Sequence, residues 1–144
     1  ACASGHALLQ ALSASSRADL RAAGAALAGL GGGFTPAGDD FLTGAMMALW
    51  ALRDSAGAGA VAGTLAQAAV PRTTAVSAAW LDAAARGEAT ESWHRFLEAL
   101  AAGQAQAAAE AEQRILAIGH TSGEDALLGF LLSAETLAGS TPAV

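Results

Sequence analysis

Apolar residues recur at helical spacing along most of this chain, which is the pattern expected of an α-helical protein. Residues 6–30 follow it, and Ser16 with Asp19 three positions later has the form of a capping box, which marks a helix start. The three glycines at 31–33 end the pattern, because a glycine inside a helix costs about 1 kcal/mol. We predict helical structure over residues 6–30, followed by a loop that reaches residue 40.

Two later stretches are apolar on nearly every face. They span residues 41–53 and 125–137, and a helix of this kind is buried on most of its sides. Shorter helices are predicted between them, over residues 60–70, 73–86, 91–102 and 104–118. The pattern predicts an all-α fold, a compact bundle of seven to eight helices around two buried central helices. No linker divides the chain, so residues 1–144 are expected to form a single all-α domain.

Composition supports the all-α prediction and limits the function. Alanine, the best helix former, makes up roughly three residues in ten. The net charge is −6, and the chain contains arginine but no lysine. Such an acidic, lysine-free surface argues against binding to nucleic acid or to an anionic membrane.

The cysteine content and the length of the apolar segments indicate the cellular compartment. Cys2 is the only cysteine, which rules out a disulfide within the chain and fits a reducing compartment. The strongly apolar run over 41–52 is far shorter than the ~20 residues that span a bilayer, and no signal-like segment precedes it. We therefore expect a cytoplasmic protein. Because the chain starts at Ala1 without methionine, we expect it to be the C-terminal part of a longer chain.

A repeated segment marks the start of both apolar helices. Gly38–Gly44 and Gly123–Gly129 each read Gly, acid, Asp, any, Leu, any, Gly, after a loop rich in Gly, Thr and Ser. One acid would satisfy the preference for a carboxylate in the first helical turn, so two in each copy exceed what capping requires. Gly44 and Gly129 lie four residues into their helices, where glycine permits close helix approach. We predict that the helices cross there and that both acidic turns face one cavity.

The two turns supply the candidate site residues. Helix N-termini favour anions, and glycine-rich loops let the backbone approach a ligand. The candidate catalytic residues are Asp39, Asp40, His120 and Asp125. The candidate substrate-binding residues are Gly32, Gly33, Thr35, Gly38, Thr73, Thr121, Ser122 and Gly123. No cofactor is fixed by the sequence, but carboxylates of this kind suit Mg²⁺, and Asp40, Glu124 and Asp125 are the candidate metal ligands.

The first loop also carries a family resemblance. Residues 30–42 read LGGGFTPAGDDFL, which resembles the GxGLTPxGDDFL signature of the AllH-like family, with Phe34 where that family usually has Leu. Arg72-Thr73-Thr74 and the segment Gly119–Gly123 are similar to the family in the same order. The resemblance covers about residues 25–132 and corresponds to the C-terminal half of the family's chains.

The resemblance implies a subunit of oxamate carbamoyltransferase. That system exchanges oxalurate and phosphate for oxamate and carbamoyl phosphate in anaerobic allantoin (purine) catabolism. It implies FdrA-like and AllG-like subunits as partners and a small anionic substrate, and the sequence leaves a homo-oligomer open. The resemblance does not say which subunit holds the active site.

Three functional hypotheses follow. The chain is an enzyme subunit that binds carbamoyl phosphate, oxamate or oxalurate at the acidic turns. Alternatively, it is a non-catalytic assembly subunit whose acids only cap helices. A third hypothesis is a Mg-dependent hydrolase resembling the ADP-ribosylglycohydrolases, and it ranks last because the additional acidic cluster expected of such enzymes is not visible.

Overall fold

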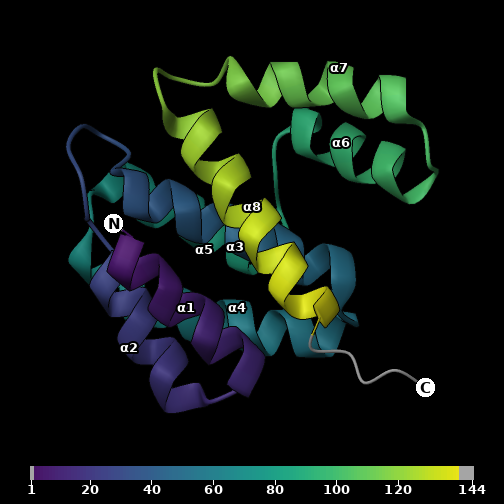
Figure 1. Ribbon diagram of the computed structural model, residues 1–144. Helices are drawn as coiled ribbons and strands as arrows, with labels where there is room; N and C mark the ends of the chain where they lie inside the picture. The colour runs from purple at the N-terminus through teal and green to yellow at the C-terminus, as the bar shows by residue number, and fades with distance from the viewer. Residues whose placement is uncertain (1, 140–144) are drawn as a thin grey trace.

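The computed structural model describes residues 2–139, and every regular element among them is a helix. This confirms the predicted all-α fold class. The described part contains eight α-helices and one 3₁₀ helix (Figure 1). They are α1 (Cys2–Ala14), α2 (Arg17–Leu27), α3 (Ala37–Leu52), α4 (Ser55–Ala69), η1 (Val70–Arg72), α5 (Ala75–Ala85), α6 (Glu91–Ala101), α7 (Ala105–Leu116) and α8 (Ser122–Gly139).

The predicted stretch over residues 6–30 is two helices. Ser15 has a left-handed backbone, with φ of 51°, which ends α1. The hydroxyl of Ser16 then accepts a hydrogen bond from the backbone N–H of Asp19 at 3.3 Å, so the predicted cap begins α2. The break lies in the middle of a continuous helical pattern, and only the cap marks its position.

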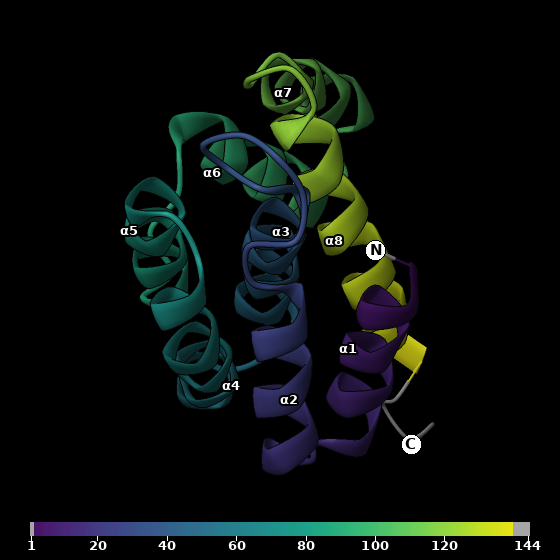
Figure 2. The ribbon, with the colours of Figure 1, turned by 90° about the vertical axis from the view of Figure 1, so that its left-hand side faces the viewer.

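The helices are arranged around α3. In Figure 1, α8 crosses α3, and α6 pairs with α7 at one end of the molecule. Turned by 90°, Figure 2 shows α4 and α5 on one flank of α3 and α1 and α8 on the other, with α2 between α1 and α4. The pair of α3 and α8 shares the most extensive contact of any two helices in the described chain.

Burial differs between these two helices. Most of α3 is buried, including the run from Phe41 to Leu49 apart from Thr43. In α8, Leu128 and Leu131 are 49% and 55% exposed. The expectation that residues 125–137 are buried on most sides is therefore wrong for the face that carries these leucines, because no described helix covers it. None of the described helices is long and apolar enough to cross a lipid bilayer.

Gly44 and Gly129 lie where α3 and α8 approach each other. A Cβ placed on Gly44 would overlap the carbonyl oxygen of Ala126, and one placed on Gly129 would overlap that of Phe41. Both neighbours are backbone atoms of the facing helix, which cannot move as a side chain can. Because glycine has no side chain, these two positions allow α3 and α8 to lie this close together.

We expect Gly44→Ala and Gly129→Ala each to destabilise the protein by more than about 3 kcal/mol, because overlap with backbone forces the helices apart. Gly63→Ala in α4 is the matched control. A Cβ there meets nothing within 4 Å, so it should raise stability by about 0.5–1 kcal/mol. Urea unfolding followed by circular dichroism measures both. A loss below 1 kcal/mol at Gly44 and Gly129 would show that the crossing is not tight.

Candidate functional site

Asp39 is a buried structural residue. It is 1% exposed. Its Oδ1 accepts a hydrogen bond from the backbone N–H of Gly29 at 3.0 Å, and its Oδ2 accepts one from the Thr73 hydroxyl. This carboxyl therefore ties the loop after α2 to the segment before α5. Both its oxygens accept hydrogen bonds within the protein, and Asp39 lines neither of the cavities beside the two acidic turns.

The glycine-rich loop is held at both of its ends. Gly31 and Gly33 have φ values of 121° and 91°, a region that favours glycine. The carbonyl of Phe34 accepts a hydrogen bond from the Thr74 hydroxyl at 2.6 Å. The hydroxyls of Thr35 and Ser122 are 2.9 Å apart and form a hydrogen bond that joins the two acidic turns.

Beside this hydrogen bond lies a cavity of about 190 Å³. It lies among α3, α5, α6, α7 and the start of α8. Its polar lining consists of Thr35, Asp40, Thr43, Glu88, Thr90 and Ser122. Its apolar lining includes Met47, Trp80, Trp93, Ile115 and Ile118, with Gly119 and Gly123 completing the wall near α8. The volume is below the ~300 Å³ at which sites for drug-sized ligands begin, so the cavity suits a small molecule or part of one.

Two residues that line this cavity each carry a buried side-chain oxygen with unmet hydrogen-bonding capacity. Asp40 Oδ2 and Thr90 Oγ1 are buried and have no hydrogen-bond partner. Among the described residues, only Ser133 carries another such side-chain atom. Buried polar atoms are nearly always paired in folded proteins. Two such oxygens in residues that line one cavity therefore make it the candidate place for a molecule that forms hydrogen bonds.

The pKa of Asp40 is raised from 3.8 to about 6. Burial is the main cause, because it penalises the charged carboxylate. The negative charges of Asp125 and then Asp39 raise the pKa further, while hydrogen bonding of the Ser122 and Thr35 hydroxyls to the carboxyl lowers it. A carboxyl with this pKa exchanges protons near neutral pH, as general acids and bases do.

The two acids of the second turn do not line this cavity. Asp125 lines a separate, mostly apolar cavity of about 300 Å³, together with His6 from α1. Glu124 is exposed. The two turns are near enough for Asp125 to affect the pKa of Asp40, yet their carboxyls face different cavities.

The other predicted site residues are divided in the same way. Thr35, Ser122 and Gly123 line the cavity of Asp40. Thr73 binds Asp39, and a Cβ on Gly38 would overlap the carbonyl of Leu27, so both have packing roles. The remaining four residues are exposed and line no cavity described here: Gly32, Gly33, His120 and Thr121.

The predicted magnesium ligands do not form a set. No group of three or more His, Cys, Asp or Glu side chains in the described residues is arranged to hold a metal ion. Asp40, Glu124 and Asp125 point to different surroundings, as described above. The Mg²⁺ site expected from the sequence therefore stays a prediction, since magnesium is usually held by only one or two carboxylates together with substrate phosphate.

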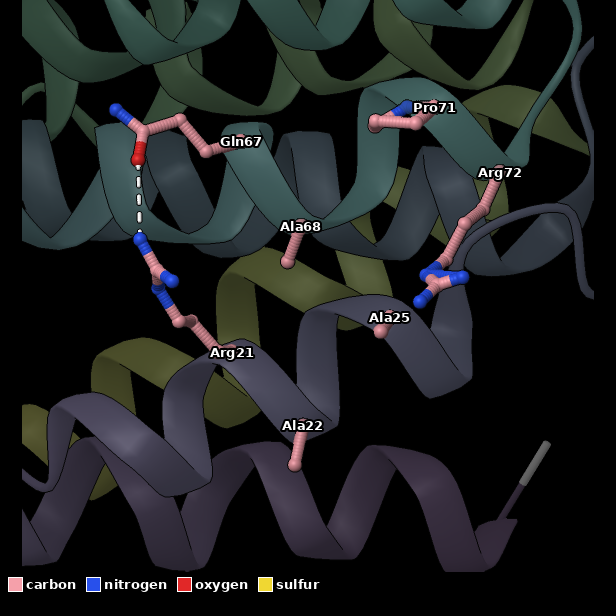
Figure 3. Close-up of a pocket in the computed structure, with 7 residues that line it drawn as sticks. All are labelled: Arg21, Ala22, Ala25, Gln67, Ala68, Pro71 and Arg72. Carbon is pink, nitrogen blue, oxygen red and sulfur yellow. Dashed lines mark hydrogen bonds between the residues drawn. The ribbon is translucent and has the colours of Figure 1, made fainter.

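A larger groove lies away from the acidic turns, between α2 and α4 (Figure 3). It has a volume of about 630 Å³ and is lined by Arg21, Gln67 and Arg72, with small residues between them. The Arg21 guanidinium donates a hydrogen bond to Gln67 at 3.4 Å. We place the candidate site at Asp40, because the unpaired buried oxygens are there and this groove is open.

Sequence reasoning missed several cavity residues. Thr43 is one turn after Asp40 on the same helix, so helical spacing gives a signal for it. Trp80, Glu88 and Thr90 come from α5 and the segment after it. They are far from both repeated turns in the sequence, and no pattern in the chain links them to Asp40.

The fold and the cavity together define an all-helical protein with a small, acid-containing cavity beside a crossing of two helices. Residues 27–134, most of the chain, match the family described as oxamate carbamoyltransferase subunit AllH. The chain therefore belongs to this family, which confirms the resemblance found in the sequence and implies a subunit of oxamate carbamoyltransferase. No solved structure matches the chain.

We expect Asp39→Ala to cost at least about 2 kcal/mol of stability, since it leaves the Gly29 N–H and the Thr73 hydroxyl without their acceptor. Thr73→Val removes only one of these hydrogen bonds and should cost less. Thermal or urea unfolding measures both variants. A cost below 0.5 kcal/mol for Asp39→Ala would contradict the structural role.

Asp40→Asn should stabilise the protein at pH 8 and not at pH 4. Between pH 4 and 6 the folded protein holds a proton that the unfolded chain has released, so stability falls as pH rises through this window. Allowing for partial exposure, the ionised carboxyl costs on the order of 1–2 kcal/mol. Asparagine carries no charge and avoids this cost. Urea unfolding of both proteins at the two pH values tests the difference, and an equal gain at both would refute it.

Proposed function

We propose that this chain is a substrate-binding subunit of oxamate carbamoyltransferase and that the Asp40 cavity receives the uncharged carbamoyl or amide group of a small anionic substrate. The single observation that carries this proposal is the unpaired, buried Oδ2 of Asp40 in a small cavity. Carbamoyl phosphate, oxamate and oxalurate all contain a –CO–NH₂ group and also a negative charge.

Charge decides which end of the substrate enters. Among the described residues, no arginine, lysine or histidine lines the cavity, whereas Asp40 and Glu88 do. A carboxylate or phosphate placed beside a half-buried carboxyl would lose hydration and gain repulsion. A –CO–NH₂ group carries no charge, so it enters at lower cost.

Hydrogen bonding also favours entry of the –CO–NH₂ end of the substrate. The two N–H donors of an amide suit Asp40 Oδ2 and Thr90 Oγ1, the two buried oxygens that lack partners. The amide carbonyl needs a donor, and one of the two hydroxyls of Thr35 and Ser122 keeps a proton that their mutual hydrogen bond does not use. A backbone anion site is not favoured, because the amides of Gly38 and Gly123 already donate to backbone carbonyls at 2.9 and 3.1 Å.

Asp40 also suits the proton transfer that carbamoyl transfer requires. When oxalurate forms, the amide nitrogen of oxamate bonds to the carbamoyl carbon and the bond from that carbon to phosphate breaks. The attacking nitrogen loses one proton. A carboxylate whose pKa is about 6 accepts a proton more readily than an ordinary aspartate. We assign Asp40 this role as general base.

We propose a cytoplasmic protein that assembles with FdrA-like and AllG-like subunits in purine catabolism. The assembly-only hypothesis remains the alternative, and it requires that Asp40 serve no purpose beyond the first turn of α3. The buried Oδ2 of Asp40, which lacks a partner, counts against the assembly-only hypothesis. A carboxyl that only caps a helix does not need a cavity beside it.

Asp40→Asn should lower kcat of the assembled enzyme by about 100-fold or more, the usual contribution of a general acid or base. In the unmodified enzyme, kcat/KM should fall below a pH near 6, where Asp40 becomes protonated, and the variant should lack this limb. Steady-state assays of oxalurate formation measure both effects.

The matched control is Glu124→Gln, which removes one exposed charge from the first turn of α8. Its kcat should stay within about threefold, because this side chain reaches no cavity described here. If Asp40→Asn retains normal kcat and the same acid limb, the chain is an assembly subunit and the proposed catalytic role is wrong.

A further inference from the structure

Resting on the function proposed above, we infer that a partner subunit covers the mouth of the Asp40 cavity and supplies the positively charged side chain that holds the anionic end of the substrate. The site in this chain is incomplete without it. An anion at this cavity needs a positively charged side chain nearby, and the described residues of this chain place none in the cavity lining.

The cations of this chain are engaged or lie elsewhere. Arg86 contacts the cavity lining, since it forms an ion pair with Glu88, which lines the cavity. Its guanidinium donates to both Glu88 oxygens, at 2.9 and 3.2 Å, and it also pairs with Asp82 at 3.3 Å. Arg86 is therefore already neutralised.

The arginines without a recorded carboxylate partner do not line this cavity. Arg21 and Arg72 both line the separate groove between α2 and α4 (Figure 3). Because the chain contains no lysine, no other long cationic side chain type is available. A substrate whose amide end is next to Asp40 thus meets no arginine, lysine or histidine among the described residues that line the cavity.

The mouth of the cavity has the surface of an interface. Trp80 and Ile118 line the cavity and are nevertheless 50% and 38% exposed. Phe34, which adjoins the cavity residue Thr35, is 83% exposed. Its carbonyl is hydrogen-bonded to Thr74 at the start of α5, the helix that carries Trp80. Large aromatic side chains of this kind are enriched where proteins bind each other.

Charge complementarity selects the kind of partner. This chain has a net charge of −6, and the proposed substrates are anions, so a basic contact surface is attracted to both. A second copy of the chain would bring another −6 and the same few arginines. The occupant is therefore a different subunit of the enzyme, with an arginine or lysine at its contact.

Oxamate and oxamide form the test pair, because oxamide replaces the carboxylate of oxamate with an uncharged amide of nearly equal size. The isolated chain should bind oxamide at least as well as oxamate. The complex with FdrA-like and AllG-like subunits should bind oxamate about tenfold or more tightly than the isolated chain, with much less gain for oxamide, and salt should reduce the gain. Calorimetric titration measures all four affinities.

Two variants make the test independent of assembly. Ile118→Arg places a cation at the mouth and should raise oxamate affinity of the isolated chain by about tenfold without a like gain for oxamide. Leu100→Arg, at a residue that is 48% exposed but outside the cavity, is the matched control and should change neither. Trp80→Ala should weaken assembly while leaving the helical circular dichroism unchanged.

The outcomes separate the two proposals. If oxamide binds neither the chain nor the complex, the proposed function fails and this inference fails with it. If oxamide binds but the complex gains equally for both ligands, the partner only closes the cavity and the inference alone is wrong. It is also wrong if the isolated chain already prefers oxamate, or if Ile118→Arg gives no preference for oxamate.

Discussion

The close approach of α3 and α8 is the constraint on which the rest of this structure depends. Gly44 and Gly129 let each helix backbone contact a carbonyl of the other. The first turns of both helices then lie near each other, and Thr35 and Ser122 join them with a hydrogen bond. A wider crossing, set by any larger side chain, would separate Asp40 from Ser122 and open the cavity wall.

The adjacent residues Asp39 and Asp40 have different roles, because the first stabilises the turn and the second lines the cavity. Successive residues of a helix point about 100° apart. Asp39 therefore faces inward and binds the loop at Gly29, while Asp40 faces the cavity. The first stabilises the turn that positions the second. The second is held in surroundings that penalise its charge, which is a common arrangement at functional sites.

The sequence was informative where local rules decide the structure. Helical spacing predicted the all-α fold, the Ser16 cap was at its predicted position, and Gly44 and Gly129 lie at the crossing. The family resemblance was confirmed over most of the chain.

The sequence did not predict the direction of individual side chains or the contacts between segments that are far apart in the chain. The two acidic turns read alike, but Asp40 and Asp125 face different cavities. Spacing alone does not say on which side of a helix crossing a side chain will lie. Trp80 and Thr90 reach the cavity through tertiary packing, to which a periodic pattern is insensitive. For the same reason, Asp40, Glu124 and Asp125 do not gather into one group of three acids among the described residues.

The hydrogen bond between Thr35 and Ser122 has a consequence for how the protein forms. It joins residues 87 positions apart, and the helices it links share the most extensive contact in the described chain. Closing so long a segment is slow relative to forming local helix pairs. During synthesis, α1 to α7 leave the ribosome before α8 can pack, so α3 keeps an apolar face open until late. The cavity is therefore among the last features of the molecule to exist, and a nascent chain without α8 has no substrate site to occupy.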